Sequence, residues 1–507
     1  MGNLLGIDLG TSGVKALLCD EEGRVLGRFG QAYDTMRPHP HWAEQDPNQW
    51  WSAVVAVLKA VTRFRIDVVG LTGQMHGPVF IGPDGHSLHP CIIWADTRAR
   101  RESIALKKRL SAARILDVTG NPAGEAFTAP KILWIEQERP QVFERVHKIL
   151  LPKDFIGLRL TEEFATDHSD ASGTLLYDIR AGTWSDEIIA ELNIRSSLLP
   201  DILDSSAILG QVTSTAARQT GLVEGTPVVV GAGDLATAAV GGGIGEGRTP
   251  LVNIGTAAQV IVPLSSLRED LLGKLYVFRQ AVPEKLFAMG TVPAAGASIQ
   301  WYRNNLGMLE SLVAKDLGIA VYDVLDRLAS QAPPGARGLF FLPYFFGTGN
   351  PHLDYRAQGA LIGLTAMHSR AEMVRALMEG VAYGLKDCLK AFEIRPTEIR
   401  MGSGGAKSTL WRQIIADTLG AGVAVVKEKD LSAFGACLLA GVAVGVYRNL
   451  EEAWRRVQIE ELISPDDNNQ RIYAAGYGIF SSLYGRLRSS FHEIDRFSSL
   501  AENGREQ

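Results

Sequence analysis

The first residues with the means to do chemistry lie in GIDLGTSGVKALL, residues 6–18, where an aspartate, glycines and hydroxyls interrupt an apolar run. Apolar residues alternate again after the glycines, which predicts strand, tight turn and strand with Asp8 at the mouth of the hairpin. Glycine-rich turns let backbone N–H groups point into one space, and a hydroxyl adds a further donor, so such a turn can cradle an oxyanion. We expect Thr11, Ser12 and Lys15 to contact nucleotide phosphates.

Asp8 would repel a phosphate bound at this turn unless a divalent cation lay between them. Mg²⁺ prefers carboxylate and phosphate oxygens and keeps much of its water. Asp8 is therefore predicted to ligate Mg²⁺, directly or through water. An aspartate that only caps the turn is the alternative.

A second stretch, VNIGTAAQVIV at 252–262, repeats the order apolar residue, acid or amide, apolar residue, Gly, Thr, two small residues and apolar strand. Gly-Thr turns are common, so coincidence is the alternative explanation. A shared role in phosphate binding favours a duplicated domain, with two loops that hold the β- and γ-phosphates of one nucleotide. Gly255 and Thr256 are the expected contacts in the second loop.

A third glycine cluster, RMGSGGAKSTLWRQIIADTLG at 400–420, follows a strand-like segment and runs into an amphipathic helix. Its spacing matches neither the Walker GxxxxGK[ST] loop nor the Rossmann GxGxxG turn. Small side chains here would let adenine and ribose lie against the backbone, although an ordinary strand-to-helix turn would look the same. The expected nucleotide contacts are Gly404, Gly405, Ala406 and Ser408.

Composition limits the protein class. The chain has 507 residues, 46% hydrophobic and 21% charged, with a formal net charge of −5. A size of roughly 100–200 residues per domain predicts two to four domains. Nothing resembles the basic patch that nucleic acid or an anionic membrane would require, so small neutral or anionic ligands are expected.

Four scattered cysteines without CxxC spacing favour buried thiols in a reducing cytoplasm; they are Cys19, Cys91, Cys388 and Cys437. The N-terminus lacks the pattern of a secretory signal, and no apolar run approaches the ~18 residues of a membrane span. We expect a protein that is neither exported nor anchored.

The order of elements predicts an α/β protein. A strand-rich opening is followed by alternating helices and strands, which indicates a sheet with helices on its faces. DPNQWW supplies a helix start at Asp46 and Pro47. The Gly-rich piece 241–249 is the expected boundary between domains 1–243 and 250–490, with a tail at 491–507.

Several segments in order resemble the FGGY carbohydrate kinase family over nearly the whole chain, to about residue 490: the two loops, GSGGAKSTLWRQ, TAPKILW at 128–134 and GALIGLTAMHSRAEMVRALMEG at 359–380. The resemblance implies two duplicated actin-like, ribonuclease H-like ATPase domains with an interdomain cleft, a sugar as phosphoryl acceptor, and ATP and Mg²⁺ as cofactors. Further segments are similar to those of family members that phosphorylate xylulose: RPHPHWAEQDPNQWW, GQMHG, LLPKDF, TDHSDASGT and GAGDLATAAVG.

The family resemblance also implies residue roles. In GQMHG, residues 73–77, Gln74, Met75 and His76 would line the sugar pocket, whereas the residue types alone fit a packing methionine and a structurally satisfied histidine. Asp234 in GAGDLATAAVG would contact the sugar and act as the general base. An aspartate between glycine and an Ala-rich helix is otherwise a common helix cap.

Two departures from the family pattern leave the sugar open. The second loop reads GTAAQ where the xylulose-phosphorylating members carry GTSG, and FFGTGNPH replaces a segment with an acid–arginine pair. D-xylulose is the first expectation, with L-xylulose, ribulose and sedoheptulose as alternatives. A non-catalytic sugar sensor and an actin-like filament protein remain alternatives from other classes, and a homodimer is left open.

Overall fold

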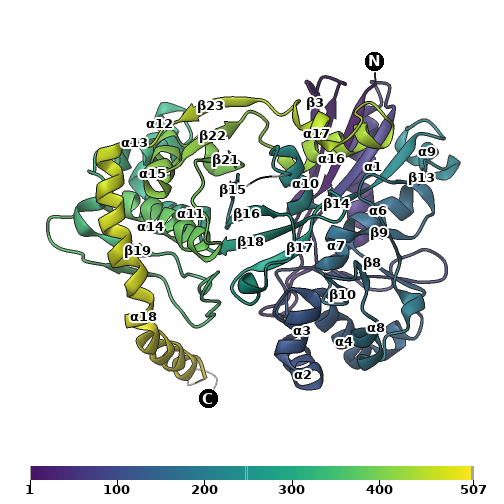
Figure 1. The fold of residues 1–507 in the computed structure, drawn as a ribbon, viewed down its shortest axis with the longest axis horizontal. Helices are drawn as coiled ribbons and strands as arrows, with labels where there is room; N and C mark the ends of the chain where they lie inside the picture. The colour runs from purple at the N-terminus through teal and green to yellow at the C-terminus, as the bar shows by residue number, and fades with distance from the viewer. Residues whose placement is uncertain (1, 246, 248, 504–507) are drawn as a thin grey trace. The chain divides into compact units, whose positions relative to one another are not determined.

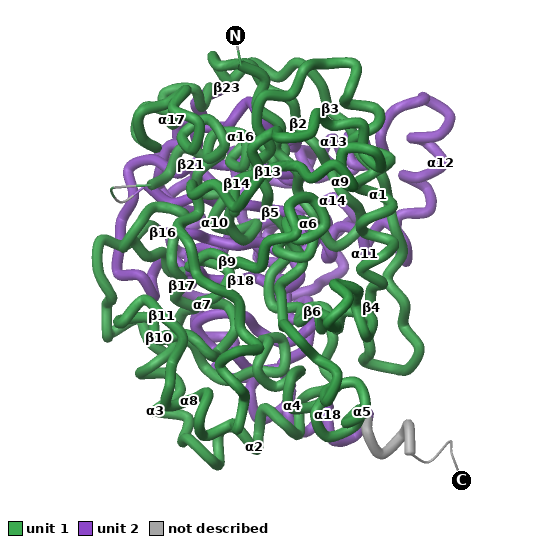
Figure 2. The backbone as a smooth tube through the Cα atoms, turned by 90° about the vertical axis from the view of Figure 1, so that its right-hand side faces the viewer, with its two compact units in different colours: residues 1–247, 263–288, 430–458 green, residues 248–262, 289–429, 459–507 purple. Residues whose placement is uncertain are grey.

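The computed structural model describes residues 2–245, 247 and 249–503, and it divides into two compact units. One unit comprises Met1–Gly247, Pro263–Ala288 and Asp430–Gln458, and the other comprises Arg248–Val262, Met289–Lys429 and Ile459–Gln507 (Figure 2).

The domain bounds expected from the sequence stay a prediction. The two compact units do not follow those bounds, because residues 263–288 and 430–458 belong to the first unit. Within the expected linker 241–249, residues 246 and 248 lie outside the described residues, as do 504–507 of the expected tail.

The first unit is built on a six-stranded sheet in the order β13-β14-β5-β1-β2-β3 (Figure 1). Its strands are β1 (Leu4–Leu9), β2 (Gly13–Cys19), β3 (Val25–Ala32), β5 (Val68–Gly73), β13 (Ile208–Gln211) and β14 (Pro227–Gly233). Strands β1 and β2 pair antiparallel up to Leu9 and Val14, which confirms the predicted hairpin and leaves residues 10–13 as its turn. Strand β1 is parallel to β5, and β5 to β14, so these three strands share one carboxyl edge.

Helices cover both faces of this sheet. Helix α1 (Pro47–Val61) begins as predicted, with Asp46 accepting a hydrogen bond from the N–H of Asn48 and Pro47 at its first position. Its buried side chains join the core formed with β1, β2 and β5. Helices α10 (Asp234–Gly241) and α16 (Leu431–Ala443) also pack in this unit, although α16 comes from late in the chain.

The remaining elements of the first unit are short: β4 (Glu44–Gln45), β6 (Val79–Ile81), β7 (Cys91–Ile92), α2 (Arg100–Leu110), α3 (Ala112–Thr119), α4 (Thr128–Glu138), α5 (Pro140–Phe143), β8 (Lys148–Leu150), α6 (Pro152–Thr161), β9 (Ala165–Asp167), α7 (His168–Ser172), β10 (Tyr177–Asp178), β11 (Thr183–Trp184), α8 (Asp186–Glu191), η1 (Ser196–Leu198), β12 (Asp201–Leu203), α9 (Ser214–Thr220), η2 (Glu269–Leu271), β17 (Tyr276–Arg279) and α17 (Leu450–Trp454).

The second large sheet has the order β17-β18-β16-β15-β21-β22-β23. Its further strands are β15 (Leu251–Ile254), β16 (Ala258–Leu264), β18 (Leu286–Val292), β21 (Glu398–Gly402), β22 (Gly422–Val426) and β23 (Ile459–Ile463). Strand β15 pairs antiparallel with β16 and parallel with β21, and β22 and β23 follow with the same directions as β14 and β13. The two sheets therefore repeat one topology, which agrees with the predicted duplication of the loops.

The second unit adds α11 (Gly296–Asn305), α12 (Met308–Leu317), α13 (Val321–Ala329), η3 (Ala336–Gly338), β19 (Phe340–Leu342), β20 (Ala360–Ile362), α14 (Arg370–Ala391), η4 (Gly404–Lys407), α15 (Thr409–Leu419) and α18 (Asp467–Asn503). Throughout the described part of the chain, none of the helices has the length and apolar character needed to cross a membrane.

Close backbone approach fixes α16 against the rest of the first unit. A Cβ added at Gly435 would lie 1.9 Å from the Thr237 carbonyl oxygen of α10, and one at Gly6 would lie 2.0 Å from the Ala433 carbonyl oxygen. Only glycine permits both contacts, because any side chain would force the backbones apart.

We predict that Gly435→Ala lowers the free energy of unfolding by ~1–3 kcal/mol, because the added methyl overpacks the contact between α10 and α16. The matched control is Gly485→Ala on α18, where an added Cβ meets nothing within 4 Å. That change should raise stability by up to about 1 kcal/mol, since alanine favours the helix. Thermal and urea unfolding of both variants measure the difference, and equal effects would contradict the packing argument.

Candidate active site

Two half-buried carboxyl groups mark the carboxyl edge of the first sheet. Asp8 lies near the end of β1, and Asp234 follows β14 as the first residue of α10. In open sheets with parallel strands, ligands bind beyond this edge. Gly233 occupies the N-cap, so Asp234 is not the helix cap that the sequence left open as an alternative.

The surroundings of Asp234 favour its protonated form. Burial raises the pKa of Asp234 to about 7, and the charge of Asp8 adds to the effect. Burial likewise raises the pKa of Asp8 to about 6, with Lys15 opposing the shift and Asp430 adding to it. A carboxyl group that titrates near neutral pH can take up and release a proton under working conditions.

One oxygen of Asp8 needs a further partner. Its Oδ1 is buried and has no hydrogen-bond partner among the residues that the structure describes. Such a lone buried oxygen fits the predicted contact to Mg²⁺ or to a water of its shell. The described residues contain no group of three or more His, Cys, Asp or Glu side chains that could hold a metal by themselves.

Gln74 is the centre of a hydrogen-bonded chain. Its Nε2 donates to Oε1 of Gln45 at 2.7 Å, and its Oε1 accepts from Oγ1 of Thr11 at 3.2 Å. Gln45 accepts from Trp50 Nε1 at 3.0 Å and donates to the Thr11 carbonyl at 2.7 Å. The hydroxyl of Thr11 also accepts from Trp94 Nε1 at 2.9 Å, and the indole of Trp94 remains 46% exposed. The predicted phosphate-loop residue Thr11 is thus part of the same network as the predicted sugar residue Gln74.

His76 is held as a neutral imidazole. Its backbone has a positive φ of 73°, and its Nδ1 lies 2.7 Å from the Gly173 carbonyl oxygen. Burial lowers the pKa of His76 to about 4. A neutral ring that donates from Nδ1 to a carbonyl leaves Nε2 as an acceptor. His76 can therefore accept a hydrogen bond from a sugar hydroxyl at Nε2.

Met75 is a packing residue as much as a pocket residue. It is buried, and a Cβ added at Gly233 would lie 2.9 Å from its Cγ. The methionine therefore lies directly against the glycine that precedes Asp234, and it connects the GQMHG segment with the predicted base.

Lys131 supports the backbone of the candidate site, and it was not among the residues predicted to act there. It is fully buried on α4, and its Nζ donates to the carbonyls of Ala126 at 2.6 Å and His76 at 3.3 Å. Burial lowers its pKa to about 7. The signal in the sequence was a lysine inside an otherwise apolar helical segment.

A buried ion cluster lies behind Asp234. The ammonium of Lys153 lies 2.6, 3.1 and 3.4 Å from three carboxylates: Asp154, Asp167 and Asp170. Asp167 also accepts a hydrogen bond from Oγ of Ser169 at 2.6 Å, and that oxygen accepts from the N–H of Gly233 at 3.0 Å. This polar support for Gly233, the residue before Asp234, is built by the segments LLPKDF and TDHSDASGT. The support was not predicted from the sequence.

In the second unit, a cavity of about 530 Å³ gathers most of the predicted nucleotide contacts: Gly255, Thr256, Gly404, Gly405 and Ser408. Ala406 is buried and is not among its lining residues. The Ser408 hydroxyl accepts a hydrogen bond from the N–H of Trp411 as the cap of α15, so it already has a structural role. Tyr322, Asp323 and Asp326 also line this cavity, and sequence analysis missed them.

The predicted site residues therefore fall into two groups. Asp8, Thr11, Ser12, Lys15, residues 74–76 and Asp234 belong to the first unit, and the contacts expected at 255–256 and 404–408 belong to the second. Ser12 is exposed in the turn. The ammonium of Lys15 pairs with Asp430 at 2.6 Å, an acid from the start of α16 that the sequence did not suggest. The roles assigned to these residues stay predictions.

We predict that Lys131→Met destabilises the protein more at pH 9.5 than at pH 7.5, relative to the wild type. Two buried carbonyls lose their donor at both pH values, whereas the wild type must release the proton of Lys131 on folding at the lower one. In the wild type, the lowered pKa of Lys131 means that the unfolded chain binds more protons between pH 7 and about 10.5. Stability from this group should therefore rise with pH in that window, by up to about 1.4 kcal/mol per unit.

Denaturant unfolding at pH 7.5 and 9.5 tests this prediction. Lys131→Met should lack the increment, whereas the exposed Lys59→Met on α1 should keep it. The same pH dependence in all three proteins would show that Lys131 does not titrate in this range.

Comparison with known proteins covers nearly the whole chain. The N-terminal domain of the FGGY family of carbohydrate kinases matches residues 3–241, and its C-terminal domain matches residues 251–444. A xylulose kinase of Escherichia coli (strain K12) is 33% identical over 95% of this chain and 99% of its own.

Solved structures agree with the fold. Xylulose kinase from Rhodospirillum rubrum superposes with a TM-score of 0.87 at 30% identity, covering 97% of this chain and all of its own. Gluconate kinase from Lactobacillus acidophilus gives 0.90 at 26% identity, covering 97% and 99%. The expected fold of two duplicated actin-like domains is thereby confirmed. Both halves of the chain match the corresponding family domains in order, and the chain belongs to the FGGY family of carbohydrate kinases.

Proposed function

We propose that this carbohydrate kinase transfers the γ-phosphoryl group of ATP to the terminal hydroxyl of a ketopentose, converting D-xylulose to D-xylulose 5-phosphate. Full-length likeness to xylulose kinases supports the choice of sugar. The observation that carries the chemistry is the carboxyl group of Asp234. It lies at the edge of the sheet beside the GQMHG segment, and its pKa is raised to about 7.

Asp234 acts in this proposal as the general base. Its carboxylate takes the proton of the attacking hydroxyl as that oxygen approaches the γ-phosphorus in line with the leaving oxygen. A positioned base of this kind contributes roughly 10²–10⁴-fold in rate. Gln74 and the neutral ring of His76 orient the sugar through its other hydroxyls, and Met75 packs the backbone that carries the base.

Asp8 is the residue proposed to hold Mg²⁺. Its buried Oδ1, which has no partner in the described part of the chain, fits the cation or a water bound to it. When bound, Mg²⁺ offsets the charge that develops on the phosphate oxygens during transfer. The backbone of 255–256 and 404–405 would hold the nucleotide without adding charge, since these positions present N–H groups and little side chain.

We also place the protein in the cytoplasm. The support is that all four cysteines are buried as free thiols. Such thiols persist in a reducing compartment.

An ADP-release assay with a sugar panel tests the proposed activity. We expect turnover with D-xylulose to exceed that with L-xylulose, ribulose, sedoheptulose and gluconate. Asp234→Asn should lower kcat by at least about 100-fold while sugar binding changes little, since the amide keeps the shape but cannot take the proton. Preference for another sugar would overturn the substrate assignment, and retention of more than about a tenth of the rate would overturn the role of the base.

Asp8→Ala tests the metal contact separately. The Mg²⁺ concentration for half-maximal rate should rise by about tenfold or more, because a charge-assisted contact is lost. The control is Asp46→Ala, which removes the cap of α1 and should leave the Mg²⁺ titration unchanged. A folded Asp8→Ala variant with an unaltered Mg²⁺ titration would instead support the turn-capping alternative.

A further inference from the structure

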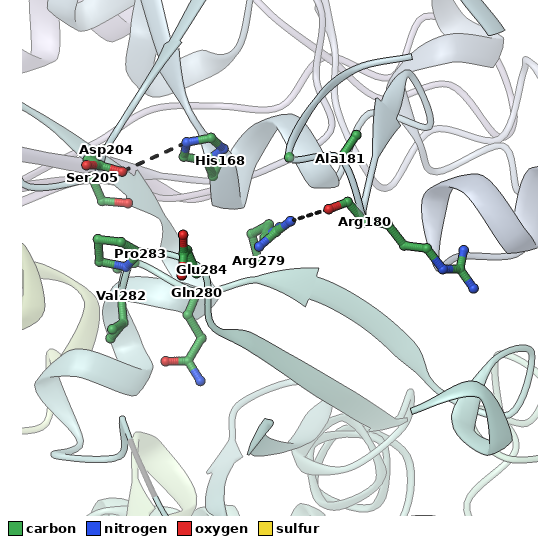
Figure 3. Close-up of a pocket in the computed structure, with 12 residues that line it drawn as sticks. His168, Arg180, Ala181, Asp204, Ser205, Arg279, Gln280, Val282, Pro283 and Glu284 are labelled. Carbon is green, nitrogen blue, oxygen red and sulfur yellow. Dashed lines mark hydrogen bonds and ion pairs between the residues drawn. The ribbon is translucent and has the colours of Figure 1, made fainter. Parts of the chain in front are cut away.

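A second cavity lies within the first unit, apart from the residues assigned to the reaction. Its volume is about 490 Å³, which falls within the range of roughly 300–1,000 Å³ typical of small-molecule sites. Its polar lining includes the side chains of His168, Asp204, Ser205, Arg279 and Glu284 (Figure 3).

Strand β17 separates this cavity from the sugar residues. Phe278 points to one face, where its ring centroid lies 6.1 Å from that of His76. The next residue, Arg279, points to the opposite face because side chains alternate along a strand. The cavity is therefore behind the candidate active site and not a part of it.

Arg279 brings a positive charge that no acid in the described part of the chain neutralises. Its Nη2 donates to the carbonyls of Ile179 at 2.7 Å and Arg180 at 3.3 Å, both of which are uncharged partners. Its Nε is buried without a hydrogen-bond partner among the described residues. A guanidinium that lines a cavity and has only neutral partners is suited to bind a phosphate or carboxylate there.

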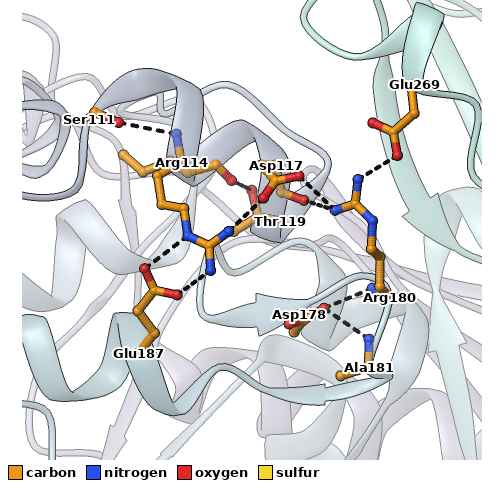
Figure 4. Close-up of polar contacts among 10 residues, drawn as sticks. Ser111, Arg114, Asp117, Thr119, Asp178, Arg180, Ala181, Glu187 and Glu269 are labelled. Carbon is orange, nitrogen blue, oxygen red and sulfur yellow. Dashed lines mark hydrogen bonds and ion pairs between the residues drawn. The ribbon is translucent and has the colours of Figure 1, made fainter.

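Arg180 shows the contrast, because its own charge is already paired. Only its backbone faces Arg279 in Figure 3, and its side chain points away. Figure 4 shows that guanidinium between Asp117 and Glu269, with 3.0 Å from Nη1 to Asp117 Oδ1. Arg114 continues this network, pairing with Asp117 at 2.6 Å and with Glu187 at 2.6 Å.

The rim of the cavity is fixed in advance of any ligand. Asp178 Oδ1 accepts from the N–H groups of Arg180 and Ala181, each at 2.9 Å, which closes the turn at the mouth. Gly182 has a positive φ of 75°, and a Cβ there would lie 3.3 Å from Nη2 of Arg279. A turn that is already ordered loses little entropy when a ligand binds.

The other polar groups suit hydroxyls better than a second anion. Asp204 Oδ1 lies 3.9 Å from His168 Nε2, too far for a direct hydrogen bond but close enough for both groups to contact one ligand hydroxyl. Glu284 adds a further acceptor. One cation together with several acceptors matches a ligand that carries one anionic group and several hydroxyls.

We propose that this cavity is a second binding site for a small phosphorylated sugar, with the phosphate on Arg279 and the hydroxyls toward Asp204 and His168. Members of this family form phosphorylated sugars, so the proposed ligand is of the same class as the product that the enzyme itself releases. The inference does not depend on which sugar is phosphorylated.

The site connects to the predicted base through hydrogen bonds. Ser205 lines the cavity and donates from Oγ to Asp167 Oδ2 at 2.9 Å. The same carboxylate oxygen accepts from Ser169, whose Oγ accepts from the N–H of Gly233, directly before Asp234. A ligand that shifts Ser205 therefore acts on the segment that carries the base, and we expect it to lower kcat.

Calorimetric titration tests the site with protein that is kept saturated with unphosphorylated D-xylulose. The probes are D-xylulose 5-phosphate, D-glucose 6-phosphate, D-gluconate and inorganic phosphate. We expect at least one sugar phosphate to bind more tightly than both phosphate and gluconate, and Arg279→Met to weaken it by about tenfold or more. Arg65→Met, which removes an exposed cation of the same unit, should bind as the wild type does.

Further outcomes decide the inference even if Arg279→Met fails to fold. Hydrogen exchange on the wild type should show protection at 179–182 and 280–285 when the sugar phosphate is added. Unchanged exchange at both segments, no binding of either sugar phosphate, or equal binding to a folded Arg279→Met variant would overturn the proposal. Binding of D-glucose 6-phosphate without turnover of D-xylulose would reject the proposed substrate while supporting the site.

Discussion

The partial burial of two neighbouring carboxyl groups, those of Asp234 and Asp8, is the constraint on which the site depends. Two carboxyl groups removed from water at one edge of a sheet repel each other and favour protonation, which is why the pKa of Asp234 rises to about 7. The fold tolerates this arrangement because β1, β5 and β14 hold the edge from below and α10 and α16 pack closely beside it. A cation shared with phosphate oxygens would reduce the repulsion between the two carboxylates. The binding of the nucleotide and the ionisation of these acids would therefore favour each other.

The polar support behind the base follows from the same constraint. A buried acid keeps its position only if the backbone around it is satisfied, and the N–H of Gly233 finds its acceptor in Ser169. That hydroxyl depends on Asp167, which depends in turn on the buried ammonium of Lys153. Loss of the Lys153 ammonium would leave three buried acids without their cation, which is more costly than the loss of an exposed ion pair. The cluster therefore positions the base without contacting a substrate.

Local pattern was enough to predict some of this structure. The hairpin at Asp8 and the start of α1 at Asp46 follow from alternation, glycine turns and capping, all of which are set by neighbours in the chain. The placement of α16 against β1 was not predictable in this way, because it depends on Gly6 and Gly435 meeting backbone from distant segments. Lys131, Trp94 and the Lys15–Asp430 pair were missed for the same reason, since their partners become visible only once the chain is folded.

The two hairpins show how a repeated fold acquires two different functions. Asp8 and Asn253 occupy equivalent places, each one residue before the last of its strand, and each pairs across to the second strand of its hairpin. The amide of Asn253 carries no charge and accepts from the Ser403 hydroxyl at 3.4 Å, within the unit that holds the nucleotide cavity. An acid there would place a second negative charge beside the expected phosphates, whereas one acid in the first hairpin suffices for one cation. The change from carboxylate to amide thus keeps the geometry of the duplicated turn and removes the repulsion, which agrees with the proposed division of metal and base to one half and nucleotide to the other.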